Sequence, residues 1–208
     1  MCGRFNNHLS AMHGWADLLA DWPTDEALRG YNIAPTRTIS VVTKQGIRRA
    51  RWGLVPAWSP EFTSKYPTHN ARSETVAQKP TFRGAVQHGR SCLVPIAGYY
   101  EWQKKGDIKQ PYYVHQPNNI TVLAGYWEAW NDQESFTLLT EDARDALLGV
   151  HHRMPIMLTR AQAIDWLANP ILDDIINTQN HQKMVFYSVD PRVNSARQEG
   201  VELIEPQA

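Results

Sequence analysis

The sequence predicts an α+β fold: one strongly curved, largely antiparallel, barrel-like β-sheet with a few flanking helices. Short runs rich in β-branched and aromatic residues alternate with turn signals, as they do in antiparallel hairpins. The regular alternation of strands and helices that marks a parallel sheet is missing. The 208 residues, of which 42% are hydrophobic, suffice for one sizeable core. We therefore expect a single domain over residues 1–208.

The first part of the chain combines helical and hairpin patterns. Leu9, Met12, Trp15 and Leu19 recur at helical spacing, and Pro23 ends the predicted helix. Further on, two apolar runs flank a Lys-Gln-Gly turn, which predicts a hairpin over residues 38–54. The stretch 56–70 is rich in Pro, Trp, Ser and Thr and is expected to be a long surface loop. A short helix over 81–87 follows, closed by a glycine.

The remainder is predicted to be mostly strands, over residues 91–102, 111–115, 120–127, 136–140, 155–158, 185–189 and 201–204. Two threonines stand where helix caps are expected. Thr140 precedes two acidic residues that suit a helix N-terminus, and Thr159 precedes a predicted helix that runs to Leu167.

The charge is balanced overall but unevenly distributed. Residues 1–110 carry 15 Lys and Arg against 8 Asp and Glu, a net charge of +7, whereas residues 111–208 carry −7. This asymmetry permits a basic face on a neutral protein, or cancels if the two halves interleave in space. Eight tryptophans add large aromatic surfaces, which fill cores and also stack on nucleic-acid bases.

Two cysteines, Cys2 and Cys92, provide neither a disulfide framework nor metal-ligand spacing. Cys92 lies in an apolar run and is expected to be buried. No signal peptide and no membrane-spanning run are evident. We expect a cytoplasmic monomer that uses no metal and no cofactor.

Cys2 directly follows Met1, and removal of Met1 would place an α-amine and a thiol on one residue. An α-amine has a pKa of roughly 7.7–8.0, so part of it is neutral and nucleophilic at cellular pH. With an aldehyde the amine forms an imine, and the thiol closes this imine to a five-membered thiazolidine. Alternatively, the thiol attacks a carbonyl with the amine as its base, as in N-terminal-nucleophile hydrolases. The plainest alternative is an ordinary second residue.

Three further stretches hold polar residues where a core would not favour them. Asn70-Ala71-Arg72-Ser73-Glu74 suits a helix entry as well as a site. Glu101, in an aromatic strand-like run, is either solvated or desolvated with a raised pKa that suits proton transfer. His151 and His152 are adjacent, and on a strand they would point to opposite faces, which disfavours a shared metal.

Together these stretches resemble the SRAP family of abasic-site processing proteins, first described as SOS-response-associated peptidases. The resemblance covers nearly the whole chain, through the ordered motifs Met1-Cys2-Gly3-Arg4-Phe5, Tyr31-Asn32-Ile33-Ala34-Pro35, Trp52-Gly53-Leu54-Val55-Pro56, Asn70-Ala71-Arg72-Ser73-Glu74, Gly98-Tyr99-Tyr100-Glu101-Trp102, His151-His152-Arg153-Met154-Pro155 and Glu202-Leu203-Ile204-Glu205-Pro206.

The resemblance implies binding of single-stranded DNA that contains abasic sites and a covalent thiazolidine link, formed through a Schiff base, between the aldehyde and Cys2. It implies that Glu101 is the acid and base, that His151 assists proton transfer and that Asn70 forms a hydrogen bond in the active site. Some lyase and self-processing activity would accompany the link. His152 stands where an aspartate is frequent in the family, so its role is open.

The DNA contacts that the resemblance implies come from Arg4, Asn32, Pro35, Trp58, Arg72, Trp102 and Arg153. Two alternative functions remain at this stage: a thiol peptidase or autopeptidase with Cys2 as nucleophile, and a single-strand binder that forms no covalent link. The planar guanidinium of arginine suits phosphates and exposed aromatic rings suit unpaired bases, which favours a DNA partner. We expect the protein in the cytoplasm, associated with the nucleoid when it is bound to DNA.

Overall fold

The computed structural model describes residues 2–9, 14–176 and 183–207. Its larger sheet closes on itself, because β9 pairs with both β3 and β8 while β2 and β5 complete the ring. Most pairings are antiparallel, and the parallel ones join β9 to β3 and to β4. The strands of this barrel sheet are β2 (Thr38–Thr43), β3 (Gly46–Trp52), β4 (Asn70–Arg72), β5 (Ser91–Ile96), β8 (Thr121–Trp130), β9 (Gln133–Asp142), β10 (Arg153–Pro155) and β11 (Met157–Leu158). The predicted fold class is confirmed.

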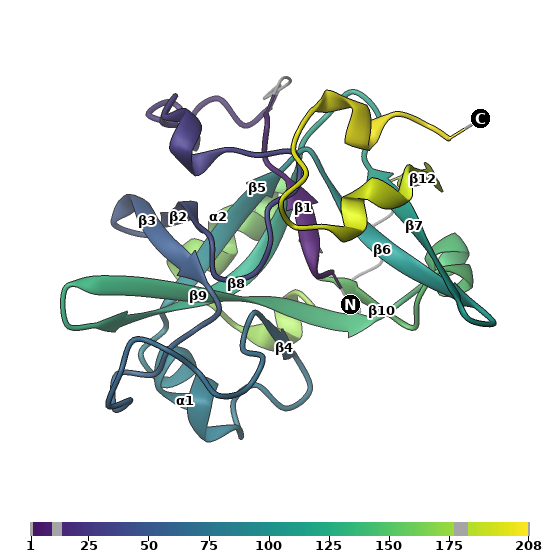
Figure 1. The fold of residues 1–208 in the computed structure, drawn as a ribbon. Coiled ribbons are helices and arrows are strands. Elements are labelled where there is room, and N and C mark those ends of the chain that lie inside the picture. Colours follow the sequence, from purple (N-terminus) through teal and green to yellow (C-terminus); the bar gives the residue numbers. More distant parts are fainter. Residues whose placement is uncertain (1, 10–13, 177–182, 208) are drawn as a thin grey trace.

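A second, four-stranded antiparallel sheet carries the amino terminus. Its strands run in the order β1 (Arg4–Asn6), β6 (Gly98–Lys105), β7 (Ile108–His115) and β12 (Val185–Ser188). The β6–β7 hairpin projects from the body, and the C-terminal segment lies across this sheet (Figure 1).

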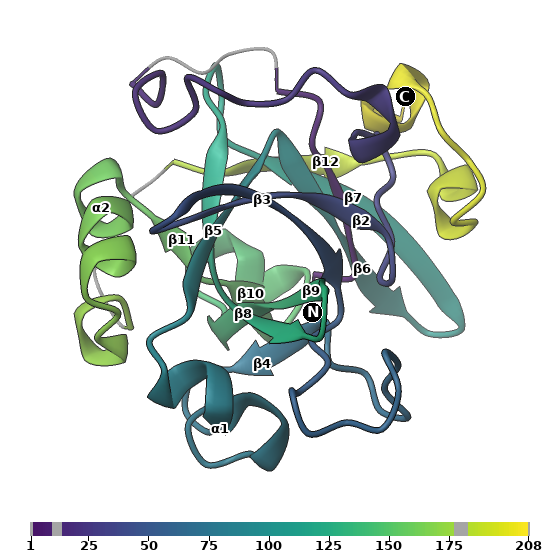
Figure 2. The same cartoon turned by 90° about the vertical axis from the view of Figure 1, so that its left-hand side faces the viewer.

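Helices lie on the outside of the barrel (Figure 2). The α1 helix covers Pro80–Gln87, and α2 covers Arg160–Ala168. The predicted cap of α2 is confirmed: the Thr159 hydroxyl accepts the amide of Gln162, whose side chain accepts the amide of Thr159 in return. Short 3₁₀ helices cover Glu26–Leu28, Asp145–Gly149, Leu172–Asp174, Pro191–Asn194 and Val201–Ile204.

Tertiary pairing overrides local pattern at several places. The predicted N-terminal helix is not formed where the chain is described: residues 14–21 make turns that bury Trp15 and Leu19, and positions 10–13 lie outside the described residues. Thr140 is a buried strand residue between β4 and β10 rather than a helix cap. Its hydroxyl donates to the carbonyl of Ala71. Sheet bonds on both sides of Thr140 outweigh the acidic cap signal.

Three further strand predictions need correction. The run 91–102 is broken at Ala97, so that its first half belongs to the barrel and its second half to the four-stranded sheet. The segment Val201–Ile204 forms a 3₁₀ helix, in which Leu203 is buried against the four-stranded sheet together with Tyr100 and Tyr113. The run 155–158 is divided at Ile156 between β10, which pairs with β9, and β11, which pairs with β8. The other predicted strands and the 38–54 hairpin are present within a few residues of their expected ends.

The core between the two sheets reaches the amino terminus. Cys2 and Phe5 are fully buried in one cluster with aromatic residues of β3 and β9. Phe5 lies 4.6 Å from Trp52, measured between ring centroids. The start of β1 is therefore held by packing against the barrel.

Within the described ranges, no helix is long and apolar enough to cross a membrane.

Candidate functional site

Cys2 stands where the four-stranded sheet meets the barrel. The pairing of β1 with β6 sets Arg4 opposite Tyr100 and so brings the preceding residues toward Glu101. The thiol of Cys2 donates a weak hydrogen bond to the carbonyl of Arg4, with a sulfur–oxygen distance of 3.7 Å. Burial raises the pKa of this thiol far above its ordinary value, and the Glu101 carboxylate raises it further. The thiol is therefore protonated at neutral pH.

Asn70 reaches Cys2 from the barrel. The indole N–H of Trp52 donates to the carbonyl of His69 over 2.8 Å, which holds the start of β4 beside the Phe5–Trp52 pair. From there the side-chain amide of Asn70 donates to the carbonyl oxygen of Cys2 over 2.7 Å. Its amide oxygen is buried and has no hydrogen-bond partner among the described residues. This oxygen is therefore available to accept a hydrogen bond from a bound molecule.

Glu101 lies on β6 and is 4% exposed. Burial raises the pKa of its carboxyl group above the ordinary value, while the amide of Trp102 and the charge of His152 act in the opposite direction. Its charge in turn raises the pKa values of Cys2 and Tyr99. Of the two alternatives left open by the sequence, the structure shows the desolvated carboxylate, next to the thiol. Gly98 is needed nearby, because a Cβ there would lie 2.5 Å from the ring of Tyr113.

The two histidines do not alternate as strand residues would. They precede β10, and their rings stack with centroids 4.2 Å apart. The expectation that they point to opposite faces is wrong, because the chain turns before the strand begins. Nδ1 of His151 lies 2.9 Å from the amide nitrogen of Arg153 and 3.2 Å from its carbonyl oxygen. We assign Nδ1 as the acceptor in the shorter contact, which places the proton of the neutral ring on Nε2. Burial lowers the pKa of His151 to about 4.

Arg153, predicted to bind DNA, is 4% exposed. Its guanidinium contacts Glu74 at 2.7 Å and Asp142 at 2.6 Å, and it donates to the carbonyl of Thr140 at 2.7 Å. Burial alone lowers its pKa, but the two carboxylates together raise it above the ordinary value. These contacts join β9, β10 and the segment after β4. They favour a structural role for Arg153 over a phosphate contact.

Arg4 and Asn32 face the C-terminal segment. The Arg4 guanidinium donates to the side chain of Asn32 at 2.8 Å and to the carbonyls of Val193 and Asn194 at 2.9 and 3.1 Å. The buried Asn32 amide donates to the carbonyls of Ser195 and Gln198 as well, at 3.0 Å each. Both residues therefore hold the C-terminal segment on the sheet.

The other predicted DNA-binding residues are more accessible. Arg72 is exposed at the end of β4, and Trp58 is 68% exposed in the loop before it. Trp102 is half-buried and donates its indole N–H to the Asn194 side chain at 2.6 Å, and Pro35 is also half-buried. The structure thus leaves Arg72 and Trp58 free of the buried contacts that hold Arg4 and Arg153.

Three residues with functional potential were missed by the sequence analysis. Tyr99 is buried beside Cys2 and Glu101; burial raises its pKa well above the ordinary value, and negative charge on either neighbour would raise it further. His69 precedes Asn70, and burial lowers its pKa. Tyr66, in the loop before β4, is 78% exposed. Only Tyr66 had a usable signal, namely an aromatic residue inside a polar loop.

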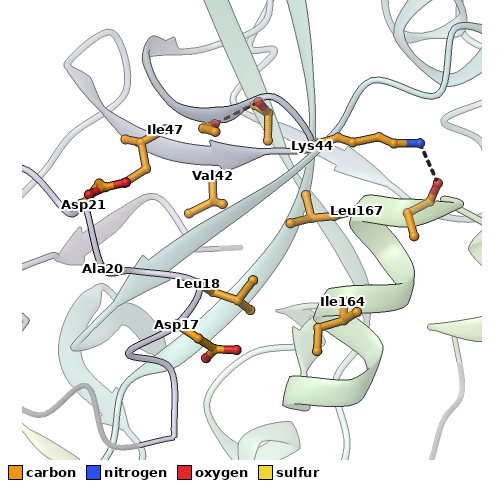
Figure 3. Close-up of a pocket in the computed structure, with 12 residues that line it drawn as sticks. Asp17, Leu18, Ala20, Asp21, Val42, Lys44, Ile47, Ile164 and Leu167 are labelled. Carbon is orange, nitrogen blue, oxygen red and sulfur yellow. Dashed lines mark hydrogen bonds between the residues drawn. The ribbon is translucent and has the colours of Figure 1, made fainter.

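Among the described residues, neither potential metal ligands nor a hollow beside α2 indicate a second site that shares the residues of this one. No group of three or more potential ligands among them could hold a metal ion. A hollow of about 450 Å³ lies between the β2–β3 turn and α2 (Figure 3). Its wall includes Leu18, Val42, Ile164 and Leu167, and Lys44 donates to the carbonyl of Ala168 at its edge. None of the predicted site residues lines it.

The arrangement suits addition of a nucleophile to a carbonyl compound. It combines a neutral thiol, a carboxyl group with a raised pKa and a neutral imidazole whose N–H is at Nε2. Acids of this kind donate and recover protons during carbonyl addition and loss of water. Tyr99 and the core cluster around Cys2 shield the thiol from solvent.

Known proteins resemble this chain over nearly its whole length. Over 99% of its length the chain is 30% identical to the abasic site processing protein YoqW of Bacillus subtilis (strain 168), of which it covers 99%. It is 28% identical to YedK of Escherichia coli (strain K12), also named an abasic site processing protein, with 99% and 100% of the two chains covered. A crystal structure of a Bacteroides thetaiotaomicron protein, 23% identical, superimposes with a TM-score of 0.82 over the whole of both chains.

The family profile described as SOS response associated peptidase (SRAP) matches residues 1–196. This match includes Cys2, Asn70, Glu101 and His151, and it ends within the C-terminal segment that Arg4 holds on the sheet. The chain belongs to the SRAP family.

Proposed function

We propose that this protein processes abasic sites in single-stranded DNA by linking Cys2 covalently to the ring-opened sugar. The relatives named above are abasic site processing proteins, which supports the substrate class. The observation that carries the proposal is the placement of Cys2: its carbonyl is bound by Asn70 and its thiol lies beside Glu101. A site centred on the second residue suits chemistry of a freed amino terminus.

The first step opens the sugar and forms an imine. Glu101, whose carboxyl pKa is raised by burial, donates a proton to the ring oxygen as the C1 hydroxyl loses its own. The α-amine of Cys2, freed by removal of Met1, attacks the resulting aldehyde carbon. The carbinolamine then loses water, with a proton supplied to the departing hydroxyl, to give the imine. His151 stabilises that oxygen by a hydrogen bond from Nε2–H.

The second step closes the ring. The Cys2 thiol adds across the imine: sulfur bonds to the former aldehyde carbon, and the thiol proton ends on nitrogen. Water is the only by-product of the two steps together. Because the thiol is neutral, it does not compete with the amine for the aldehyde at the start. The buried acceptor oxygen of Asn70 suits the N–H or O–H groups formed along this route.

The imine also permits a side reaction. It acidifies the hydrogens on the neighbouring sugar carbon and so allows β-elimination of the 3′ phosphate, which cleaves the strand. Thiazolidine closure removes the imine and suppresses this route. The ratio of linkage to cleavage therefore depends on how quickly the thiol closes, and a slow thiol makes the protein a lyase.

A thiol peptidase is less well supported. Such enzymes need a thiolate, which forms where positive neighbours lower the thiol pKa. At Cys2 both burial and Glu101 raise that pKa instead. No observation in the structure favours the peptidase over the DNA-linking reaction.

Single-stranded DNA is the form that the exposed surface suits. Trp58 and Tyr66 expose 68% and 78% of their surface, and exposed aromatic faces stack on unpaired bases. Arg72 adds an exposed fork beside Asn70. We expect the protein to act as a monomer in the cytoplasm and on the nucleoid, with both free cysteines reduced.

The test is a denaturing gel of protein mixed with an abasic single-stranded oligonucleotide. Protein with a free Cys2 amine, verified by mass spectrometry, should give a shifted band that survives heating. The same protein with Met1 retained or tagged should give none. A heat-stable band from protein with intact Met1 would exclude the amine mechanism. Retention on native gels alone would indicate a binder that forms no covalent link.

A further inference from the structure

Tyr99 carries a hydroxyl group into the core beside the site. It lies on β6 with Phe5 of β1 and Val114 of β7 directly opposite it on the two neighbouring strands. Residues that stand opposite each other in an antiparallel pair point to the same face of the sheet, so these two buried side chains flank the tyrosine ring. The ring is 1% exposed, and packing on both sides holds it in one place.

The same face of β6 carries Glu101. Side chains two positions apart on a strand point to the same side, so the carboxyl group is the next side chain along β6 from the Tyr99 ring. Cys2 belongs to the same buried cluster as Tyr99. Burial is the main cause that raises the pKa of Tyr99, and negative charge on Cys2 or on Glu101 raises it further. The thiol and the carboxyl group are thus the ionisable groups within electrostatic reach of this hydroxyl.

Among the residues that the structure describes, none forms a hydrogen bond with the Tyr99 hydroxyl. This is unusual, because a buried tyrosine hydroxyl normally has a partner. Two other tyrosines of the same sheet follow the rule: the hydroxyls of Tyr100 and Tyr187 each donate to a backbone carbonyl at 2.8 Å. The Tyr99 hydroxyl is therefore available to the groups that react.

Ring closure needs a path for one proton. The thiol of Cys2 loses its proton as sulfur attacks the imine carbon, and the imine nitrogen gains one. Burial holds the pKa of this thiol far above its ordinary value, so the thiolate is not formed beforehand. Direct transfer from sulfur to nitrogen would pass through a strained four-membered arrangement of sulfur, carbon, nitrogen and hydrogen. A phenol oxygen accepts one proton while it donates its own, and so it passes a proton on without ionising.

We propose that Tyr99 relays the thiol proton of Cys2 to Glu101 during ring closure. The inference rests on the proposed function, because it assigns a residue to the second step of that reaction. As sulfur bonds to the former aldehyde carbon, the S–H proton moves to the Tyr99 oxygen and the Tyr99 proton moves to the Glu101 carboxylate. The electron pair of the C=N double bond goes to nitrogen, which takes the proton that Glu101 received. Tyr99 and Glu101 end as they began, and no other reactant is consumed.

The experiment is a single-turnover reaction with an abasic single-stranded oligonucleotide, sampled with and without borohydride. Without the reductant, a denaturing gel resolves the heat-stable linked strand from the cleaved strand, and with the reductant it also captures the imine. Tyr99→Phe removes only the hydroxyl and should form the imine at the wild-type rate. Its conversion of the imine to the heat-stable link should slow by about a hundredfold, the contribution of one positioned proton-transfer group. The share of cleaved strand should rise accordingly.

Tyr126 offers a matched control. Its hydroxyl is also buried and without a hydrogen-bond partner among the described residues, but it lies on β8 against Trp166, in a different core cluster from Cys2. Tyr126→Phe should link and cleave DNA as the wild type does. Neither variant should unfold more easily than the wild type, because a hydroxyl without a partner contributes no hydrogen bond to stability. Urea unfolding midpoints check this.

Cys2→Ser supplies a second, independent readout. This variant has no thiol to close the ring, so adding Tyr99→Phe to it should leave imine formation and strand cleavage unchanged. The relay is refuted if Tyr99→Phe alone divides the imine between linkage and cleavage as the wild type does. It is refuted equally if Tyr99→Phe slows imine formation whether or not the thiol is present. Either result leaves the proposed function intact, whereas a wild type that gives no imine with borohydride refutes the proposed function and the relay together.

Discussion

The side-chain amide of Asn70 donates to the carbonyl oxygen of Cys2 over 2.7 Å and so ties β4 of the barrel to the amino-terminal residue. A hydrogen bond of this kind contributes about 0.5–1.5 kcal/mol. Asn70→Ala should therefore slow linkage to abasic DNA up to about tenfold, because Cys2 is less well positioned. Single-turnover rates on denaturing gels measure this. Gln78→Ala, an exposed amide near α1, is the matched control, and equal rates for both variants would contradict the assigned role.

Glu101 links stability to activity. Burial raises the pKa of Glu101 in the folded state, so the folded protein holds this proton more tightly than the unfolded chain does. The stability that this proton contributes is lost as the pH rises through the folded-state pKa. Glu101→Gln stays neutral and should stabilise the protein at pH 8, with no gain below the ordinary carboxyl pKa. Urea unfolding at the two pH values measures this. The same variant should link DNA about a hundredfold more slowly, since a general acid is lost. A destabilised variant at pH 8 would refute the burial argument.

His151 should give stability the opposite dependence on pH. Its folded-state pKa of about 4 lies below the ordinary value of 6.5, so the unfolded chain binds the proton more readily. Stability should therefore fall as pH drops from 6.5 toward 4. His151→Gln carries no such proton and should lose less stability over this window. Unfolding midpoints at pH 7.5 and 5 for both proteins test this, and parallel losses would show that other groups cause the decline.

Two arginines separate a structural role from phosphate binding. Arg153 is buried with Glu74 and Asp142, whereas Arg72 is exposed. Arg153→Gln should destabilise the protein by about 1–3 kcal/mol, because its charge-assisted bonds are lost and the two carboxylates regain water. The salt slope of DNA affinity should not change. Arg72→Gln should leave stability intact and reduce that slope by about 0.7. The reverse pattern would restore Arg153 as a phosphate contact.

Replacing Cys2 by Ser separates the amine from the thiol. The α-amine remains and should still form the imine, but a hydroxyl closes the ring poorly. Borohydride should therefore trap a Cys2→Ser adduct that otherwise dissociates or cleaves the strand. Cys92→Ala, which removes the other buried thiol, should link as the wild type does. A heat-stable Cys2→Ser adduct formed without borohydride would remove the thiazolidine from the mechanism.

Local signals predicted those parts of the chain whose neighbours in sequence supply their partners. The 38–54 hairpin needs only two adjacent apolar runs and a turn, and the cap of α2 needs only Thr159 and Gln162. The N-terminal helix and the Thr140 cap failed for the converse reason. Their residues find stronger partners far along the chain, in the core or in sheet pairing, than the local helix offers.

The candidate site likewise combines features that the sequence predicts with features that depend on long-range packing. The sequence alone determined the chemical types present: a second-residue cysteine, a carboxylate among aromatics, an amide and an imidazole. Only the tertiary structure decided which arginines face solvent. Arg4 is held by Val193, whose carbonyl is 189 positions away, and Arg153 by Glu74, 79 positions away. A guanidinium is chemically the same whether buried or exposed, so only long-range packing determines whether a phosphate can reach it.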